Sequence, residues 1–301
     1  MSVDHRSAWS DFWAQNQQSG SGCLPKAWQG IDTAQREAWA GFARKLPKNA
    51  RVLDLATGDG LVLRWLGGFR SDLSLLGVDL ADRLPAAPRG TKIRSGVAME
   101  RLPLPDGRFT AVVSQFGFEY SDLPKSAREV ARVLRKDGIV GLITHRQDGP
   151  ILAYNLDRQE QIRWVLEDCD LPAIARRSLS MPGLGTRTIP PAITQAPVEG
   201  AKRFGPQSAA WEIAEAIRQS LVLGQRDAPG NVIKLIESIT AKAGNELARI
   251  ASLEAACRQT ADEAKFAAAL ELAGLQEIER SPLHDRAYPA PFADFRLIRH
   301  R

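Results

Sequence analysis

The chain of 301 residues has a formal net charge of +5, with 44% hydrophobic and 25% charged residues. A chain of this length and ordinary composition can bury one sizeable core and carry one added helical element. The charged N-terminus lacks the apolar run of a signal peptide and no stretch is apolar enough to span a membrane, so we expect a cytoplasmic protein.

Cysteine, histidine and basic residues form no recognisable cluster. Cys23, Cys169 and Cys257 are odd in number and far apart, which argues against a disulfide framework or a CxxC zinc site. The four histidines lack metal-ligand spacing, so we expect no metal. The one strongly basic run, RLIRHR at residues 296–301, is interpreted as a solvated tail, and we expect no nucleic-acid partner.

Residues 1–45 contain two tryptophan-rich segments with helical character, SAWSDFWAQ and IDTAQREAWAGFARKL, on either side of an SGSGCLP linker. In the second segment, Ile31, Ala34, Ala38 and Phe42 follow the spacing of one helical face, so this face should pack. One interpretation is a helix that simply covers the edge of a sheet.

The stretch VLDLATGDG, residues 52–60, predicts a buried strand and a tight turn, followed by a helix whose N-terminus faces a ligand. The dinucleotide fingerprint G-x-G-x-x-G is incomplete, because Leu63 follows Gly58 and Gly60, and Asp54 would repel a pyrophosphate. An NAD-dependent oxidoreductase is therefore disfavoured. A ligand with an ammonium and a sulfonium group suits the turn better, since the glycines allow the backbone to approach closely.

Three later segments follow in a consistent order. LSLLGVDLAD (73–82) ends a strand in an acid, MERLPLPDGRFTAVVSQFGFEYSD (99–122) contains a further strand, and SAREVARVLRKDGIVGLITH (126–145) has a helix, a turn at Gly138 and a strand. Together with the glycine turn, they make the sequence similar to the class I S-adenosylmethionine (SAM) dependent methyltransferases, of the type 11 small-molecule branch. The resemblance covers about residues 45–147.

The resemblance implies a Rossmann-like α/β fold with a seven-stranded, mostly parallel sheet, and SAM as the cofactor. In this family the acid at Asp79 binds the ribose hydroxyls, and Ala56 replaces the first glycine of the turn. Ala98 stands where an Asp usually holds the adenine amino group, so the Met99 amide or Glu100 would have to substitute. The expected cofactor-binding residues are Asp54, Ala56, Thr57, Gly58, Gly60, Asp79, Leu80, Ala98, Met99, Glu100, Gln115 and Phe116.

Four regions follow from these patterns. They are residues 1–45, an N-terminal helical element that the resemblance suggests is a lid over the cofactor; 46–149, the SAM-binding core; 150–271, a helical insertion between the fifth and sixth strands; and 272–301, two closing strands expected to pair antiparallel. Inside the insertion, a stretch rich in proline and glycine, residues 181–206, is expected to separate helices. The insertion is either a cap that selects the substrate or an element for oligomerisation or stability.

Residues beyond the C-terminal ends of parallel strands are the first candidates for chemistry. His145 ends the fifth strand and is a candidate base or substrate ligand, with a hydrogen-bonded structural histidine as the alternative. Glu119 and Tyr120 could orient an amine or hydroxyl, while Gln115 and Phe116 would line the methyl and sulfonium region. We expect methyl transfer from SAM to an O, N or C atom of a small molecule. The alternative is a SAM-binding protein of the same fold that does not transfer methyl groups.

Overall fold

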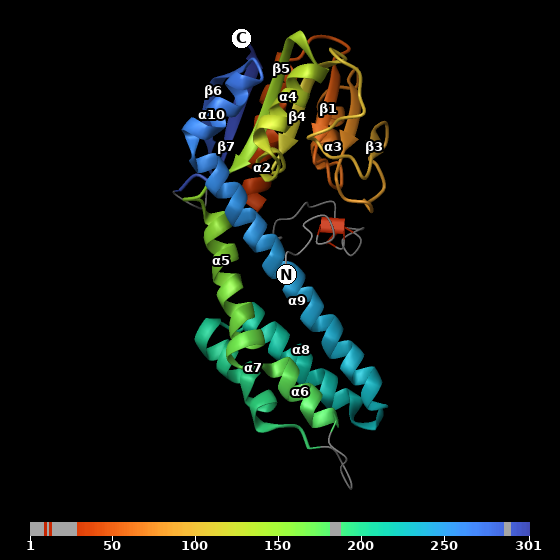
Figure 1. Ribbon diagram of the computed structural model, residues 1–301, viewed down its shortest axis with the longest axis vertical. Helices are drawn as coiled ribbons and strands as arrows, with labels where there is room; N and C mark the ends of the chain where they lie inside the picture. Colours follow the sequence, from red (N-terminus) through yellow and green to blue (C-terminus); the bar gives the residue numbers. More distant parts are fainter. Residues whose placement is uncertain (1–8, 11, 14–28, 181–187, 286–289) are drawn as a thin grey trace. The chain divides into compact units, whose positions relative to one another are not determined.

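The computed structural model describes residues 9–10, 12–13, 29–180, 188–285 and 290–301 (Figure 1). His5 and Cys23 lie outside the described residues, as does the SGSGCLP linker. The chain divides into two compact units. The core unit comprises Met1–Leu152 and Ser252–Arg301, and the helical unit comprises Ala153–Ala251.

The core unit is built on a seven-stranded sheet in the order β3-β2-β1-β4-β5-β7-β6. Strands β1 to β5 run parallel, and β7 lies antiparallel between β5 and β6. The strands are β1 (Arg51–Leu55), β2 (Ser74–Val78), β3 (Lys92–Arg94), β4 (Phe109–Gln115), β5 (Leu134–His145), β6 (Leu275–Leu283) and β7 (Ala293–His300). The expected fold class is confirmed, including the antiparallel closing pair and the helical insertion between β5 and β6.

Helices cover both faces of the sheet because its central strands are apolar on both sides, as parallel strands usually are. Ile31, Phe42 and Leu66 belong to the apolar cluster on one face, whereas Val130 and Phe266 belong to the cluster on the other. The helices of the core unit are α2 (Gln29–Lys45), α3 (Leu61–Phe69), the 3₁₀ turn η1 (Phe118–Tyr120), α4 (Leu123–Val133) and α10 (Glu263–Leu272). This packing fixes the strand ends that carry the site.

The helical unit has an apolar core of its own, which includes Trp164, Ile193 and Ile217. Two of its helices extend into the core unit: α5 (Pro150–Arg163) begins there, and the long helix α9 (Pro229–Ala261) ends there. Its other elements are the π-helical turn η2 (Trp164–Asp168), α6 (Leu171–Ser180), α7 (Pro191–Phe204), α8 (Ala209–Leu223) and the 3₁₀ turn η3 (Gly224–Arg226). Within the described residues, we find no helix long and apolar enough to cross a membrane.

Three local expectations were wrong. Residues 191–204, inside the proline- and glycine-rich stretch, form α7: Pro191 occupies its first turn, where proline is tolerated, and Pro197 lies within it. Gly138 lies within β5 and not in a turn before it. The run RLIRHR is largely strand, and Arg296 is buried because Thr144 and Glu277 accept hydrogen bonds from its guanidinium.

Candidate cofactor and acceptor site

The glycine turn joins β1 to α3 through residues in the left-handed conformation. Ala56, Gly58 and Gly60 have φ values of 52°, 52° and 73°. A left-handed alanine costs about 1 kcal/mol. Its methyl group has room because residue 117 is glycine: a Cβ there would lie 2.4 Å from the Cβ of Ala56. Gly117 was missed from the sequence, since only the folded chain brings it to the turn.

Two buried carboxyl groups lie at the same turn. The Asp54 carboxylate accepts a hydrogen bond from the Thr57 hydroxyl at 2.6 Å, and Asp79 accepts from the Gly58 and Ala81 backbone amides at 2.9 and 2.8 Å. Burial, together with the neighbouring charges of Asp79 and Asp59, raises the pKa of Asp54 to about 8 although the hydrogen bond from Thr57 opposes the shift. Burial also raises the pKa of Asp79.

Neither acid has a cationic partner among the described residues. A ligand that brings a positive charge would therefore compensate their burial, because an opposite charge nearby favours the ionised form. The Asp79 carboxylate accepts hydrogen bonds from backbone amides only, and a carboxylate has up to four acceptor positions, so it can also accept a hydroxyl hydrogen. This donor and acceptor set fits SAM, which carries an ammonium, a sulfonium and a ribose diol.

Tryptophan from the N-terminal region lies directly on this turn. Trp13 is buried, and a Cβ at Gly58 would lie 2.3 Å from its indole ring. Nearby, the hydroxyl of Ser10 accepts a hydrogen bond from the Asp82 amide at 3.1 Å. Trp13 therefore packs on the glycine turn that follows β1, and the lid stays a prediction.

The loop expected near the adenine follows β3. Its backbone is fixed to the end of β2, since the Val97 amide donates to the Asp79 carbonyl at 2.8 Å, and the Arg101 amide closes a turn onto the Ala98 carbonyl. Met99 packs against the apolar core, and Leu80, also expected at the cofactor, has an exposed side chain.

Two expected binding residues have carboxylate or amide groups that already have partners in the protein. The Glu100 carboxylate accepts a hydrogen bond from the Asp122 amide at 3.1 Å. The side-chain oxygen of Gln115 accepts from the Trp39 indole at 2.7 Å, and its nitrogen donates to Gln35 at 3.2 Å. The Gln115 side chain is thus tied to α2, which no local pattern could indicate.

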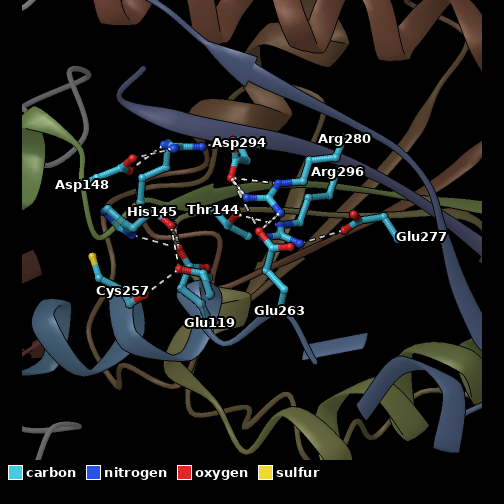
Figure 2. Close-up of polar contacts among 12 residues, drawn as sticks. Glu119, Thr144, His145, Asp148, Cys257, Glu263, Glu277, Arg280, Asp294 and Arg296 are labelled. Atoms are coloured by element: carbon cyan, nitrogen blue, oxygen red, sulfur yellow. Dashed lines mark hydrogen bonds and ion pairs between the residues drawn. The ribbon is translucent and has the colours of Figure 1, made fainter. Parts of the chain in front are cut away.

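His145 and Glu119, two candidate catalytic residues, meet at the end of β5 (Figure 2). One oxygen of Glu119 lies 2.8 Å from both the backbone nitrogen and the ring Nδ1 of His145. The Phe116 ring lies on the imidazole with 4.1 Å between centroids, and Tyr120, the third candidate, contacts it edge to face at 5.8 Å. The structure therefore brings three of the predicted site residues, Phe116, Glu119 and Tyr120, around the imidazole of a fourth, His145.

Residues far along the chain complete this arrangement. Gln259 and Thr260, near the end of α9, donate hydrogen bonds to the backbone carbonyls of Glu119 and His145, both at 2.7 Å. On the N-terminal side, the Trp9 ring contacts Tyr120 edge to face at 5.9 Å. Sequence reasoning missed these residues. No group of histidine, cysteine or acidic residues in the described part of the chain is arranged to hold a metal ion.

Part of the chain is similar in sequence to known methyltransferases. Residues 53–142 match the family described as a methyltransferase domain. The chain is 38% identical over 102 residues to the demethylmenaquinone methyltransferase of Thermus thermophilus, a match covering 31% of this chain and 46% of the relative. The chain thus spans about half the length of this curated relative.

Two solved structures with a related fold differ in how much of this chain they match. YcgJ from Bacillus subtilis is 23% identical, covering 42% of this chain and 58% of YcgJ, with a TM-score of 0.34. A structure of the Haloferax volcanii Trm112 methyltransferase activator in complex with a methyltransferase matches at 13% identity over 96% of each chain, with a TM-score of 0.46. Residues 53–142 are thus similar to a methyltransferase domain.

Proposed function

We propose that the protein transfers a methyl group from SAM to a small-molecule acceptor. The observation that carries the proposal is the pair of buried acids, Asp54 and Asp79, at a glycine turn that ends a central parallel strand. Ligands of open parallel sheets bind beyond the carboxyl ends of the strands, which is where this turn lies. The family match over residues 53–142 supports the same cofactor.

The residues of the turn would divide the binding of SAM among them. Asp79 would accept hydrogen bonds from the ribose hydroxyls, and the glycines at 58 and 60 would hold the turn in the left-handed conformation that presents its backbone to the amino-acid part. SAM supplies an electrophilic methyl group on a sulfonium. Phe116 would present its aromatic face toward that positive charge.

The acceptor would bind beside His145, whose ring lies between Phe116 and Tyr120. Much of the rate of methyl transfer comes from alignment of the reacting atoms, which walls of aromatic side chains can impose. An acceptor hydroxyl or amine also has to lose a proton, and an imidazole is the side chain that most often takes a proton in general base catalysis. We place it in the role of general base.

The test begins with calorimetric titration of the full chain with SAM and with S-adenosylhomocysteine. Asp79→Asn should weaken both by about 10- to 100-fold, because hydrogen bonds to a charged group contribute about 1.5–3 kcal/mol. Asp137→Asn is the matched control, since Asp137 is exposed and pairs with Arg135 away from the turn. Failure of the wild type to bind either ligand would refute the proposal.

The second step incubates the protein with methyl-labelled SAM and an extract separated into small molecules and macromolecules. We expect label in the small-molecule fraction. Label confined to the macromolecular fraction would refute the small-molecule acceptor. Tight SAM binding without any labelled product would favour the alternative, a SAM-binding protein without methyl transfer.

A further inference from the structure

The geometry around Glu119 determines which nitrogen of His145 carries the hydrogen. The backbone nitrogen of His145 can only donate, so the Glu119 oxygen 2.8 Å away acts as an acceptor. The ring Nδ1 lies 2.8 Å from that same oxygen. Because this oxygen already accepts one hydrogen bond, the ring contact is favourable when Nδ1 is protonated, and the neutral imidazole then has its lone pair on Nε2.

Within the described ranges, the other ring nitrogen of His145, Nε2, is left open to a ligand. No described residue forms a hydrogen bond with it, and His145 retains 7% of its surface exposed although Glu119 is wholly buried. In this pair Glu119 is buried and occupies the Nδ1 side of the imidazole, so only the Nε2 side can contact a reactant. This is the arrangement in which an acid orients a histidine base without contacting the substrate.

We propose that Glu119 is a positioning residue that holds His145 in its Nδ1–H tautomer, so that Nε2 accepts the proton of the methyl acceptor. The inference rests on the proposed function. The heteroatom of the acceptor forms a bond to the methyl carbon, the carbon–sulfur bond breaks with its electron pair remaining on sulfur, and the proton of the heteroatom passes to Nε2 of His145.

The backbone on both sides of the pair is anchored by α9. Gln259 donates to the carbonyls of Glu119 and Ser121, at 2.7 and 3.2 Å, and the Thr260 hydroxyl donates to the His145 carbonyl at 2.7 Å. A base has to stay within hydrogen-bond reach of the proton it takes. These contacts limit the movement of the backbone that carries both side chains.

Burial of the Glu119 carboxyl group lowers the stability of the fold, and this favours a functional role for the residue. Its second oxygen is buried, and no residue in the described part of the chain donates a hydrogen bond to it. A buried acceptor left without a partner destabilises a protein, and such costs tend to persist where function requires them. Cys257 does not compete as the reactive group, because burial and the charge of Glu119 raise the pKa of its thiol to about 12.

The tautomer can be measured directly in the full chain by ¹⁵N NMR of labelled histidines, at a pH where the imidazole is neutral. The His145 signals are identified by their loss in His145→Gln. We expect Nδ1–H in the wild type and in Glu119→Gln, because a glutamine oxygen can accept from the same two donors. Glu119→Ala should show a mixture of tautomers. Glu254→Gln is the matched control, a partly exposed acid of α9 paired with Arg258.

Kinetics and stability then separate positioning from a structural role. We expect Glu119→Ala to lower kcat about 100-fold with little change in KM for SAM, within the range of general base catalysis. Glu119→Gln should lose less, about 10-fold, and should melt no lower than the wild type because glutamine has the same shape and keeps the oxygen that accepts both hydrogen bonds. A Glu119→Ala variant with wild-type kcat would overturn the inference.

The two proposals fail in different ways. An Nε2–H tautomer in the wild type overturns the role of Glu119 whether or not the protein transfers methyl groups. An Nδ1–H ring in a protein that binds SAM and methylates no acceptor overturns the catalytic use of Nε2 and the proposed function together. In that case the tautomer data would still identify Glu119 as the residue that determines the tautomer of the His145 imidazole.

Discussion

The buried carboxyl of Asp54 should make the stability of the protein fall as the pH rises. Its pKa is about 8 in the folded chain, against 3.8 for an ordinary aspartate, chiefly because burial disfavours the charged form. Between these two values the folded chain holds a proton that the unfolded chain has lost. Raising the pH in this interval therefore favours unfolding. The substitution Asp54→Asn removes the titration and keeps an oxygen that can accept from Thr57.

The magnitude follows from the difference in pKa. Each unit corresponds to about 1.4 kcal/mol, so the interval of about four units sets a ceiling of about 6 kcal/mol. Between pH 5 and pH 7 the unfolded chain is ionised and the folded chain is largely protonated at this residue. We expect Asp54→Asn to gain about 3 kcal/mol relative to the wild type over these two units.

The assay is urea unfolding of both proteins at pH 5, 6 and 7, with the free energy of unfolding extrapolated to water. Asp137→Asn serves as the control, because the pKa of this exposed acid is lowered by its hydrogen bond with Arg135 and it is ionised throughout the range. If the stability difference between Asp54→Asn and the wild type is the same at every pH, Asp54 is not held in its neutral form and the reasoning is refuted.

Two further substitutions test the packing around the site. Asp294→Ala should lower the free energy of unfolding by about 3 kcal/mol, because it removes the buried partner of both Arg146 and Arg280; a loss below about 1 kcal/mol in urea unfolding would contradict this. Gly58→Ala should cost about 1–2 kcal/mol from left-handed strain and from contact with Trp13. Trp13→Ala should recover part of that loss, so strictly additive effects in the double-mutant cycle would show that the indole does not press on the turn.

Sequence patterns predicted the structure correctly where it depends on residues that are neighbours in the chain. The apolar run before Leu55, the glycines at 58 and 60 and the helix formers after them predicted β1, the turn and α3, because strand, turn and helix depend there on consecutive residues. The same local logic misjudged α7, where the prolines suggested a separator. Pro191 occupies the first turn, and burial of Ile193 against the helical unit outweighs Pro197.

The sequence by itself determined the strand, turn and helix that carry the expected cofactor site, the acids Asp54 and Asp79, and the position of His145 at the end of a strand. Only the tertiary structure decided that Glu119 faces His145 across 26 residues, and that Thr260 reaches it across 115. Side-chain spacing along one element indicates which face is buried, but a contact between distant elements depends on strand order and helix packing. The cofactor turn could therefore be recognised early, whereas the partner that orients the candidate base appeared only in the folded chain.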